Sequence, residues 1–449
     1  MTAAPSSALR RPALPRLCLA VALALGVTGA QAQSLVELYE AARGYDTTLQ
    51  AARAQYDANL AKADQAKAGL RPQAGLGAGA NWTNSRNDVT DTSRTSNSQN
   101  LTLSASQPLY RPVNRYNDEQ GQLSVEIARA QLEAAEQDLM VRSAQAYFDV
   151  LAAQDTLTFV QAQKTAVAEQ LAAAKRNFEV GTSTVTDSRE AQARYDLVLA
   201  QEIAASNDLL VKKLALDQLV GRSGASPKPL VTPVNLPVVQ PVSAEAWVEQ
   251  ALRQHPALRQ ADKAFEIAEV EVQKAQAGHK PTLDLVGQYQ VARGPNANFP
   301  TAGNVRTNNA SVGLQFNLPL YAGNAIENRV REALALVEKS RADRETAMRN
   351  ISQAIRSAYF GVVSGTGQVK ALEAAEASSQ SALDANKLGY QVGVRINIDV
   401  LNAQSQLFQT KRDLAVARYN VLVGQLRLKQ AGGVLKAEDL QPVNTLLAR

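Results

Sequence analysis

The chain has almost no cysteine, very few histidines and few aromatic residues. Of its 449 residues one is cysteine and two are histidine, and Phe, Trp and Tyr together make up 5%. Cys18 lies inside an N-terminal apolar run rather than at its end, which makes it a poor lipidation site. His255 and His279 flank predicted helix ends without metal-ligand spacing, so we interpret both as structural. These absences argue against disulfides, thiolate metal sites and histidine chemistry.

Long apolar runs are also missing after the N-terminus. Residues 1–32 are predicted to be a signal peptide: three arginines precede an apolar run over 17–27, and residues 30–32 read Ala-Gln-Ala, which fits a signal-peptidase site. The alternative is a membrane anchor, for which the run is too short. The mature chain is therefore expected to begin at Gln33 without any cysteine.

The excess of positive charge shrinks when this segment is removed. Three of the 47 Lys and Arg residues lie in it and no acidic residue does, which leaves 44 basic against 42 acidic residues. The pI of 9.1 for the whole chain therefore does not indicate a nucleic-acid partner. There is no phosphate-binding loop and no other catalytic motif. We expect neither an enzyme nor a bound cofactor or metal.

The main positive feature of the sequence is an internal repeat. Residues 33–221 and 243–433 show the same order of segments: a helix, a strand pair, a very long helix, a glycine break and another helix. Ala-Gly-Leu-Arg-Pro at 68–72 returns as Ala-Gly-His-Lys-Pro at 277–281. The linker 222–242 contains five prolines and cannot be helical. A duplicated pattern of this length is typical of an architectural protein rather than of a catalytic pocket.

Helical periodicity predicts three helices in each copy, and the leading helix should have a soft break near residues 44–46 in the first copy and a harder break at residues 255–256 in the second. The predicted ranges are 34–69, 114–180 and 185–220 in the first copy, and 243–278, 326–391 and 397–431 in the second. Each long helix should measure roughly 100 Å at 1.5 Å per residue. The two shorter helices of a copy together have about the same length as its long helix. Each copy should therefore form a two-stranded helical stave, with the linker and the tail 434–449 on its outside.

Apolar residues alternate with small or polar residues in four segments, near 74–82, 101–105, 283–291 and 310–318. This period of two predicts strands of about ten residues with one apolar face, long enough to span a membrane when tilted. Polar loops are predicted between the paired strands, over 84–100 and 293–308.

Three aromatic residues flank the predicted strands. Trp82 is expected near the outer membrane interface, and Tyr110 and Tyr321 near the inner one. The alternative for all three is ordinary packing in a sheet.

Four strands are too few to close a membrane barrel, for which about eight are needed. Open strand edges in lipid would leave backbone groups unpaired, so several copies must share one barrel. Symmetry alone allows two, three or more copies. Because the helices meet the strands at one end and the loops lie at the other, a secreted chain would place its loops outside the cell and its helices in the periplasm.

Several specific motifs accompany these features, at 277–285, 318–321, 389–395, Asp399, 417–420, and 178–181 with Asp187. Together they resemble the TolC family of outer-membrane export ducts over essentially the whole mature chain. The resemblance implies a membrane β-barrel plus an α-helical barrel, built by a homotrimer with twelve strands, twelve tunnel helices and an equatorial band. It also implies contact with outer-membrane lipid, a periplasmic adaptor and an inner-membrane pump of the ABC or proton-driven (RND) type.

The resemblance also implies a gate after the two glycine breaks. It assigns the closed-state network to Thr186 and Asp187 of the first copy and to Tyr390 and Arg395 of the second. Charge-assisted bonds from Arg395 to Thr186 and Asp187 would hold neighbouring coiled coils together, and opening would break them. The alternative is that these are exposed polar residues at helix starts, with Asp187 and Asp399 stabilising first-turn dipoles.

The same comparison implies acidic rings at the inner mouth of the duct. Asp399 matches the first ring, whereas the second position is Asn402, a departure from the family pattern. A trimer would then carry three converging carboxylates, which repel one another and favour cation binding. Block by multivalent cations should be weaker than with two rings.

The sequence therefore predicts a passive, gated export duct in the outer membrane. A periplasmic coiled-coil adaptor without its own pore is the main alternative, and the paired alternating strands argue against it. A surface adhesin or fibre would not need the duplicated order of segments. The substrate is not encoded, so multidrug efflux and protein secretion both remain open.

Overall fold

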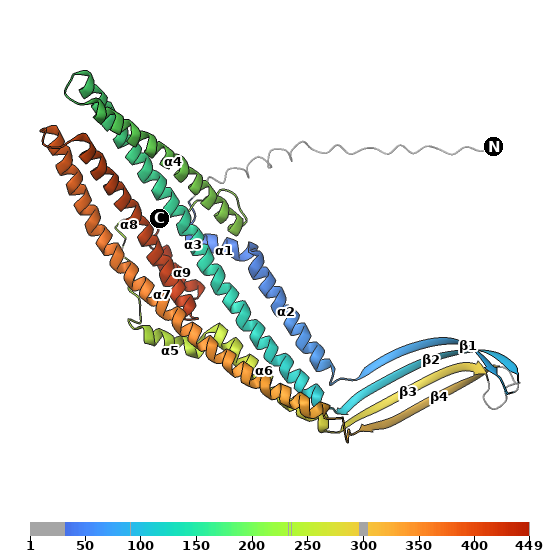
Figure 1. Ribbon diagram of the computed structural model, residues 1–449. Helices are drawn as coiled ribbons and strands as arrows, with labels where there is room; N and C mark the ends of the chain where they lie inside the picture. Colours follow the sequence, from blue (N-terminus) through green and yellow to red (C-terminus); the bar gives the residue numbers. More distant parts are fainter. Residues whose placement is uncertain (1–31, 90, 232, 235, 296–303, 449) are drawn as a thin grey trace, which may run out of the picture.

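The computed structural model describes residues 32–89, 91–231, 233–234, 236–295 and 304–448. The predicted signal peptide lies outside these described residues, apart from Ala32. The molecule is elongated, with four strands at one end and long helices at the other (Figure 1). The helices enter and leave the strands on one side, as the sequence predicts.

The strands form one antiparallel sheet that joins the two copies. Its order is β1-β2-β3-β4, with β1 at Gln73–Asn87, β2 at Thr92–Tyr110, β3 at Thr282–Pro295 and β4 at Asn304–Asn317. Leu103 lies opposite Leu76 on one side and Tyr289 on the other, while Leu285 lies opposite Leu314. Directly opposed residues share a face. The predicted apolar face is therefore continuous over all four strands.

The predicted strand lengths and the first predicted loop are wrong. The strands contain 14 to 19 residues rather than about ten. The segment 84–100 is mostly strand, because β1 and β2 stay in register up to the Asn87–Thr92 pair. Backbone pairing does not need apolar side chains, and threonine suits a strand even where the sequence looks like a polar loop. Among the described residues, the turn comprises only 88, 89 and 91. Of the second predicted loop, 293–308, residues 293–295 belong to β3 and residues 304–308 to β4, and residues 296–303 lie outside the described residues.

The leading helices are broken where the sequence predicts. In the first copy α1 (Leu35–Tyr45) and α2 (Thr47–Ala68) meet at Asp46, whose carboxylate accepts the Leu49 amide at 2.7 Å. In the second, α5 (Ala244–Gln254) and α6 (Pro256–Gln276) meet at His255, whose Nδ1 accepts the Ala257 amide at 3.1 Å. A short 3-10 turn follows α6 at Ala277–His279. His255 thus has a structural role as a helix cap.

The long helices match their predicted bounds within two residues. They are α3 (Pro112–Glu179), with 68 residues, and α7 (Ala325–Gln391), with 67. They are followed by α4 (Val185–Val220) and α8 (Asn397–Ala431). In the first copy α2 and α4 lie along successive parts of α3, and in the second α6 and α8 do so along α7 (Figure 1). The predicted staves are confirmed. In the described ranges, no helix has the length and apolar character needed to cross a membrane.

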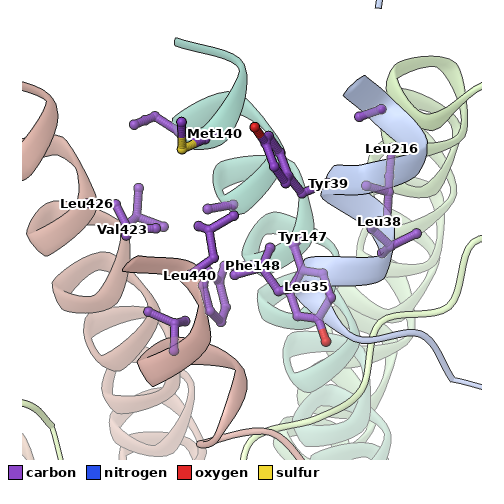
Figure 2. Close-up of a cluster of buried hydrophobic side chains, with 14 of the residues drawn as sticks. Leu35, Leu38, Tyr39, Met140, Tyr147, Phe148, Leu216, Val423, Leu426 and Leu440 are labelled. Carbon is purple, nitrogen blue, oxygen red and sulfur yellow. The ribbon is translucent and has the colours of Figure 1, made fainter. Parts of the chain in front are cut away.

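The two staves contact each other along α3, which touches α6 near the sheet and α8 farther from it. The largest apolar cluster lies where α1, α3 and α8 meet (Figure 2). There Tyr147 and Phe148 of α3 pack between α1, α8 and the short helix α9 (Leu440–Asn444). The Tyr147 hydroxyl donates to the main-chain oxygens of Gln33 (3.2 Å) and Lys228 (3.0 Å). These bonds fix the segment before α1 and the linker to the core.

The linker and the tail run side by side in the same region. Val231 N donates to Leu446 O at 2.9 Å, and Ala448 N donates to Pro229 O at 2.8 Å. The tail contributes a 3-10 turn, Ala437–Asp439, and α9. Residues 222–242 contain no helix where the structure describes them. The neighbouring position of these segments agrees with the sequence-based expectation.

Candidate gate at the helical tips

Both long helices end in the same turn, at the end of the molecule farthest from the sheet. Gly181 and Gly393 have φ angles of 75° and 82°, a left-handed conformation that glycine adopts without strain. In the first turn the Asn177 carbonyl accepts the amides of Thr182 and Ser183. In the second turn the Gly389 carbonyl accepts the amides of residues 394 and 395. The repeat therefore extends to single backbone hydrogen bonds.

The start of α4 is held by its own side chains. Thr184 and Asp187 form a reciprocal capping box, and the Ser183 hydroxyl donates to the Asp187 carboxylate at 2.7 Å. The hydrogen bond from Ser183 is the largest cause of a lowered pKa for Asp187; burial opposes it, and the bonds from Thr184 lower the pKa further. Asp187 is thus a locally bonded carboxylate, as the helix-start alternative requires. Thr186 is exposed in the same turn.

The start of α8 has no such side-chain cap. Ile396 occupies the capping position, and only its carbonyl contacts the Asp399 amide, at 3.2 Å. Arg395 Nη1 lies 3.7 Å from the Asp399 carboxylate, an ion pair within one chain. The structure does not place Arg395 on Thr186 or Asp187 within the protomer. Those bonds stay a prediction about neighbouring coiled coils.

Amide side chains join the two tips to each other. Asn177 Nδ2 donates to the Tyr390 hydroxyl at 3.3 Å. Asn397 Nδ2 donates to the Asp187 main-chain oxygen at 3.4 Å, and Asn397 Oδ1 accepts from Gln170 Nε2. Tyr390 and Asp187 therefore lie in one seam, connected through residues that sequence reasoning missed.

A comparison of the two copies could have found these amides. The position of Asn397 corresponds to Val185 in the first copy, by the same offset that relates Gly393 to Gly181. Asn177 corresponds in turn to Gly389 of the second copy. Asn177 and Asn397 are thus polar in one copy alone, and both lie where the two copies face each other.

The rest of the seam below the tips is apolar. Val167, Leu171 and Ala174 of α3 pack against Leu401 of α8 in one buried cluster, with Ile398 at its edge. An apolar seam holds the two helical hairpins, α3–α4 and α7–α8, together without fixing their register strongly, since apolar contacts are not directional.

The two pore-mouth residues lie one turn apart on α8. Asn402 is exposed and its Oδ1 accepts from Arg194 Nη2 of α4 at 2.7 Å. Asp399 is half-buried and faces Arg395. Arg194, which the sequence did not single out, therefore adds positive charge beside Asn402, the position that matches the family's second acidic ring. The ring assignments themselves stay predictions.

The three interface aromatics lie on the sheet or at its ends and are exposed. Trp82 lies on β1 opposite Asn97, toward the hairpin end. Tyr110 ends β2, and Tyr321 follows β4, both at the helical end. This placement agrees with aromatic residues at two levels of a membrane, which stays a prediction.

A partly buried ion pair links the two copies where the sheet meets the helices. Arg111, between β2 and α3, donates to both carboxylate oxygens of Asp284 on β3, with distances of 2.9 Å from Nε to Oδ1 and 2.6 Å from Nη2 to Oδ2. The Asp284 side chain is 7% exposed and that of Arg111 is 47% exposed. Two parallel bonds fix the relative orientation of the strands and the first long helix.

Known proteins share this architecture. The family model described as "Outer membrane efflux protein" matches residues 38–222 and 247–434. Outer membrane protein TolC of Vibrio cholerae is 33% identical over 95% of this chain and 97% of its own length. Alkaline protease secretion protein AprF of Pseudomonas aeruginosa is 32% identical over 92% of this chain and 87% of its own. The solved CmeC outer membrane channel of Campylobacter jejuni has a TM-score of 0.78 at 16% identity, covering 92% and 90% of the two chains, a likeness of fold alone.

Proposed function

The chain belongs to the outer membrane efflux protein family, whose members are channels and not enzymes, and from this premise we propose that it forms a passive, gated exit duct. It is an outer-membrane channel of a tripartite export system, with its helical part in the periplasm. The observation that carries the proposal is the separation of its two ends. A sheet with one continuous apolar face lies at one end, and two facing helical tips lie at the other.

Three copies build the duct. One copy supplies four strands, and its outer strands β1 and β4 leave backbone groups unpaired at both edges. In lipid such edges must be closed, and three copies provide twelve strands, more than the smallest barrel needs. The sheet's other face carries Gly75, Ser104, Gln288 and Ser311, small and polar side chains that suit a water-filled lumen. The linker 222–242 and the tail 434–449 form an equatorial band.

The gate opens when the second hairpin moves away from the first. The absence of a side-chain cap at the start of α8, against the capping box of α4, supports the second hairpin as the mobile one. Tyr390 and Arg395 hold it in the closed trimer, with Thr186 and Asp187 as partners on neighbouring coiled coils. A periplasmic adaptor and an inner-membrane pump of the ABC or proton-driven type supply the energy and the signal to open.

Native mass spectrometry of the mature protein in detergent tests the assembly, and we expect a mass of three chains. Ion conductance through planar lipid bilayers tests the duct. A species of one chain that conducts no ions would refute the proposal and favour the pore-free adaptor.

The exported class is a protein substrate, because a relative of nearly the same length is named for protease secretion. Deletion of the gene in the host, followed by proteomics of the culture medium, should show the loss of one or more secreted proteins. Unchanged secretion together with increased sensitivity to drugs would assign the chain to multidrug efflux instead.

A further inference from the structure

Asn397 is the most completely buried polar side chain at the tips. It is the first residue of α8 and is 1% exposed. Its amide makes two hydrogen bonds, and both partners lie in the first copy: Gln170 on α3 and the Asp187 carbonyl on α4. One side chain of the second hairpin thus contacts both helices of the first.

The surroundings make this amide selective for one arrangement of the hairpins. The contact between α3, α4 and α8 below it is built from aliphatic side chains, among them Val167, Ala191 and Leu401. A buried amide in such surroundings is tolerated only when its donor and acceptor are paired. Sliding or rotation of α8 would keep much of the apolar contact but would leave Asn397 unpaired. The amide therefore penalises wrong registers.

The same bonds can be broken without a large penalty when the hairpins separate. Water then reaches Asn397, Gln170 and the Asp187 carbonyl and replaces the lost partners. This behaviour differs from that of an ion pair, because neither amide carries charge. Salt screens charge pairs over about 10 Å at 0.1 M and leaves neutral hydrogen bonds largely unaffected.

We propose that Asn397 is a positioning residue of the gate: a neutral latch that sets the closed register of the second hairpin within each protomer. It acts separately from Arg395, whose expected partners belong to a neighbouring coiled coil. The proposal rests on the gated duct described above. It predicts that closure within one protomer does not depend on salt, whereas closure between protomers does.

Single-channel recordings of the purified full-length trimer in planar bilayers test the latch. Asn397→Val, which introduces the residue of the first copy, should raise the ratio of open to closed time roughly five- to tenfold, as expected for the loss of two hydrogen bonds. The increase should be the same at low and high salt. Asn386→Ala is the matched control, because that amide donates to Ala382 O on its own helix, and it should leave the ratio unchanged.

Gln170→Leu provides a second variant that leaves α8 intact. It should raise the ratio as well, and combining it with Asn397→Val should add less than the sum of the two, since both remove the same bond. Wild-type gating in both single variants, with Arg395→Ala raising the ratio, would overturn the latch and leave the gated duct standing. Wild-type gating in all three would overturn the gate itself. An increase that disappears at high salt would show an indirect effect on charged groups and would also overturn the latch.

Discussion

The ion pair between Arg111 and Asp284 should be a main support of the junction between sheet and helices. Arg111→Leu removes the bonds to a carboxylate whose side chain is 7% exposed. Loss of one partner from a fully buried pair costs about 3–5 kcal/mol, because the other charge stays buried and unpaired. The Arg111 side chain is 47% exposed, so water screens part of this effect. We expect a loss of roughly 2–3 kcal/mol.

Unfolding of the detergent-solubilised protein by guanidinium, followed by circular dichroism, measures this loss. Lys339→Ala is the matched control, because the Lys339–Asp343 pair is 68% and 60% exposed. It should cost no more than about 0.5 kcal/mol, as exposed helix pairs do. The double variant Arg111→Leu/Asp284→Leu should recover most of the stability, since no charge is left buried. If Arg111→Leu unfolds at the same denaturant concentration as the control, the reasoning about the unpaired carboxylate is wrong.

Three further predictions concern the gate, the mouth and the middle of the molecule. Arg395→Ala should raise the bilayer conductance of the closed duct above that of the wild type, and this difference in conductance should shrink as salt screens the bond. Equal conductance of variant and wild type at low salt would contradict this role. Asn402→Asp should tighten block by a trivalent cation and Asp399→Asn should weaken it, both measured by conductance titration. If the Asp399→Asn variant is blocked as strongly as the wild type, the ring assignment is wrong. Burial raises the pKa of Asp155 more than the hydrogen bond from Tyr419 lowers it. Because the folded state then binds this proton more tightly than the unfolded state, the buried carboxylate is unfavourable at neutral pH and its effect fades as the pH falls through the raised pKa. Asp155→Asn should therefore raise the melting temperature at neutral pH, with a smaller gain in acid, and an equal gain at both pH values would contradict the assignment.

The architecture could be read from the sequence because it depends on local signals. Glycine and proline breaks fix where the helices end, and the bounds of α4 and α8 follow directly from them. The apolar face of the strands follows from the alternation of apolar and polar residues, because a shift of one residue in register would turn all the apolar side chains to the other face. Strand length could not be read in this way, because backbone pairing extends β1 and β2 into polar residues.

The candidate site was harder to predict because it depends on contacts between the copies. Asp187 and Asp399 stand at matching positions in the sequence, yet one completes a capping box and the other pairs with Arg395. The role of Asn397 requires knowledge of which helix of one copy faces which helix of the other. No periodicity within a copy carries that information.

Cross-linking of the tips connects the gate to conduction. The mature chain is expected to contain no cysteine, so Asp187→Cys/Arg395→Cys places one pair of thiols in each protomer. In the trimer under oxidising conditions, we expect the thiol at position 187 of one coiled coil to link to the thiol at position 395 of the neighbouring coiled coil and to hold the bilayer conductance at its closed level, and a reductant should restore opening. Failure to cross-link, or full opening of the cross-linked protein, would contradict a gate at the helical tips.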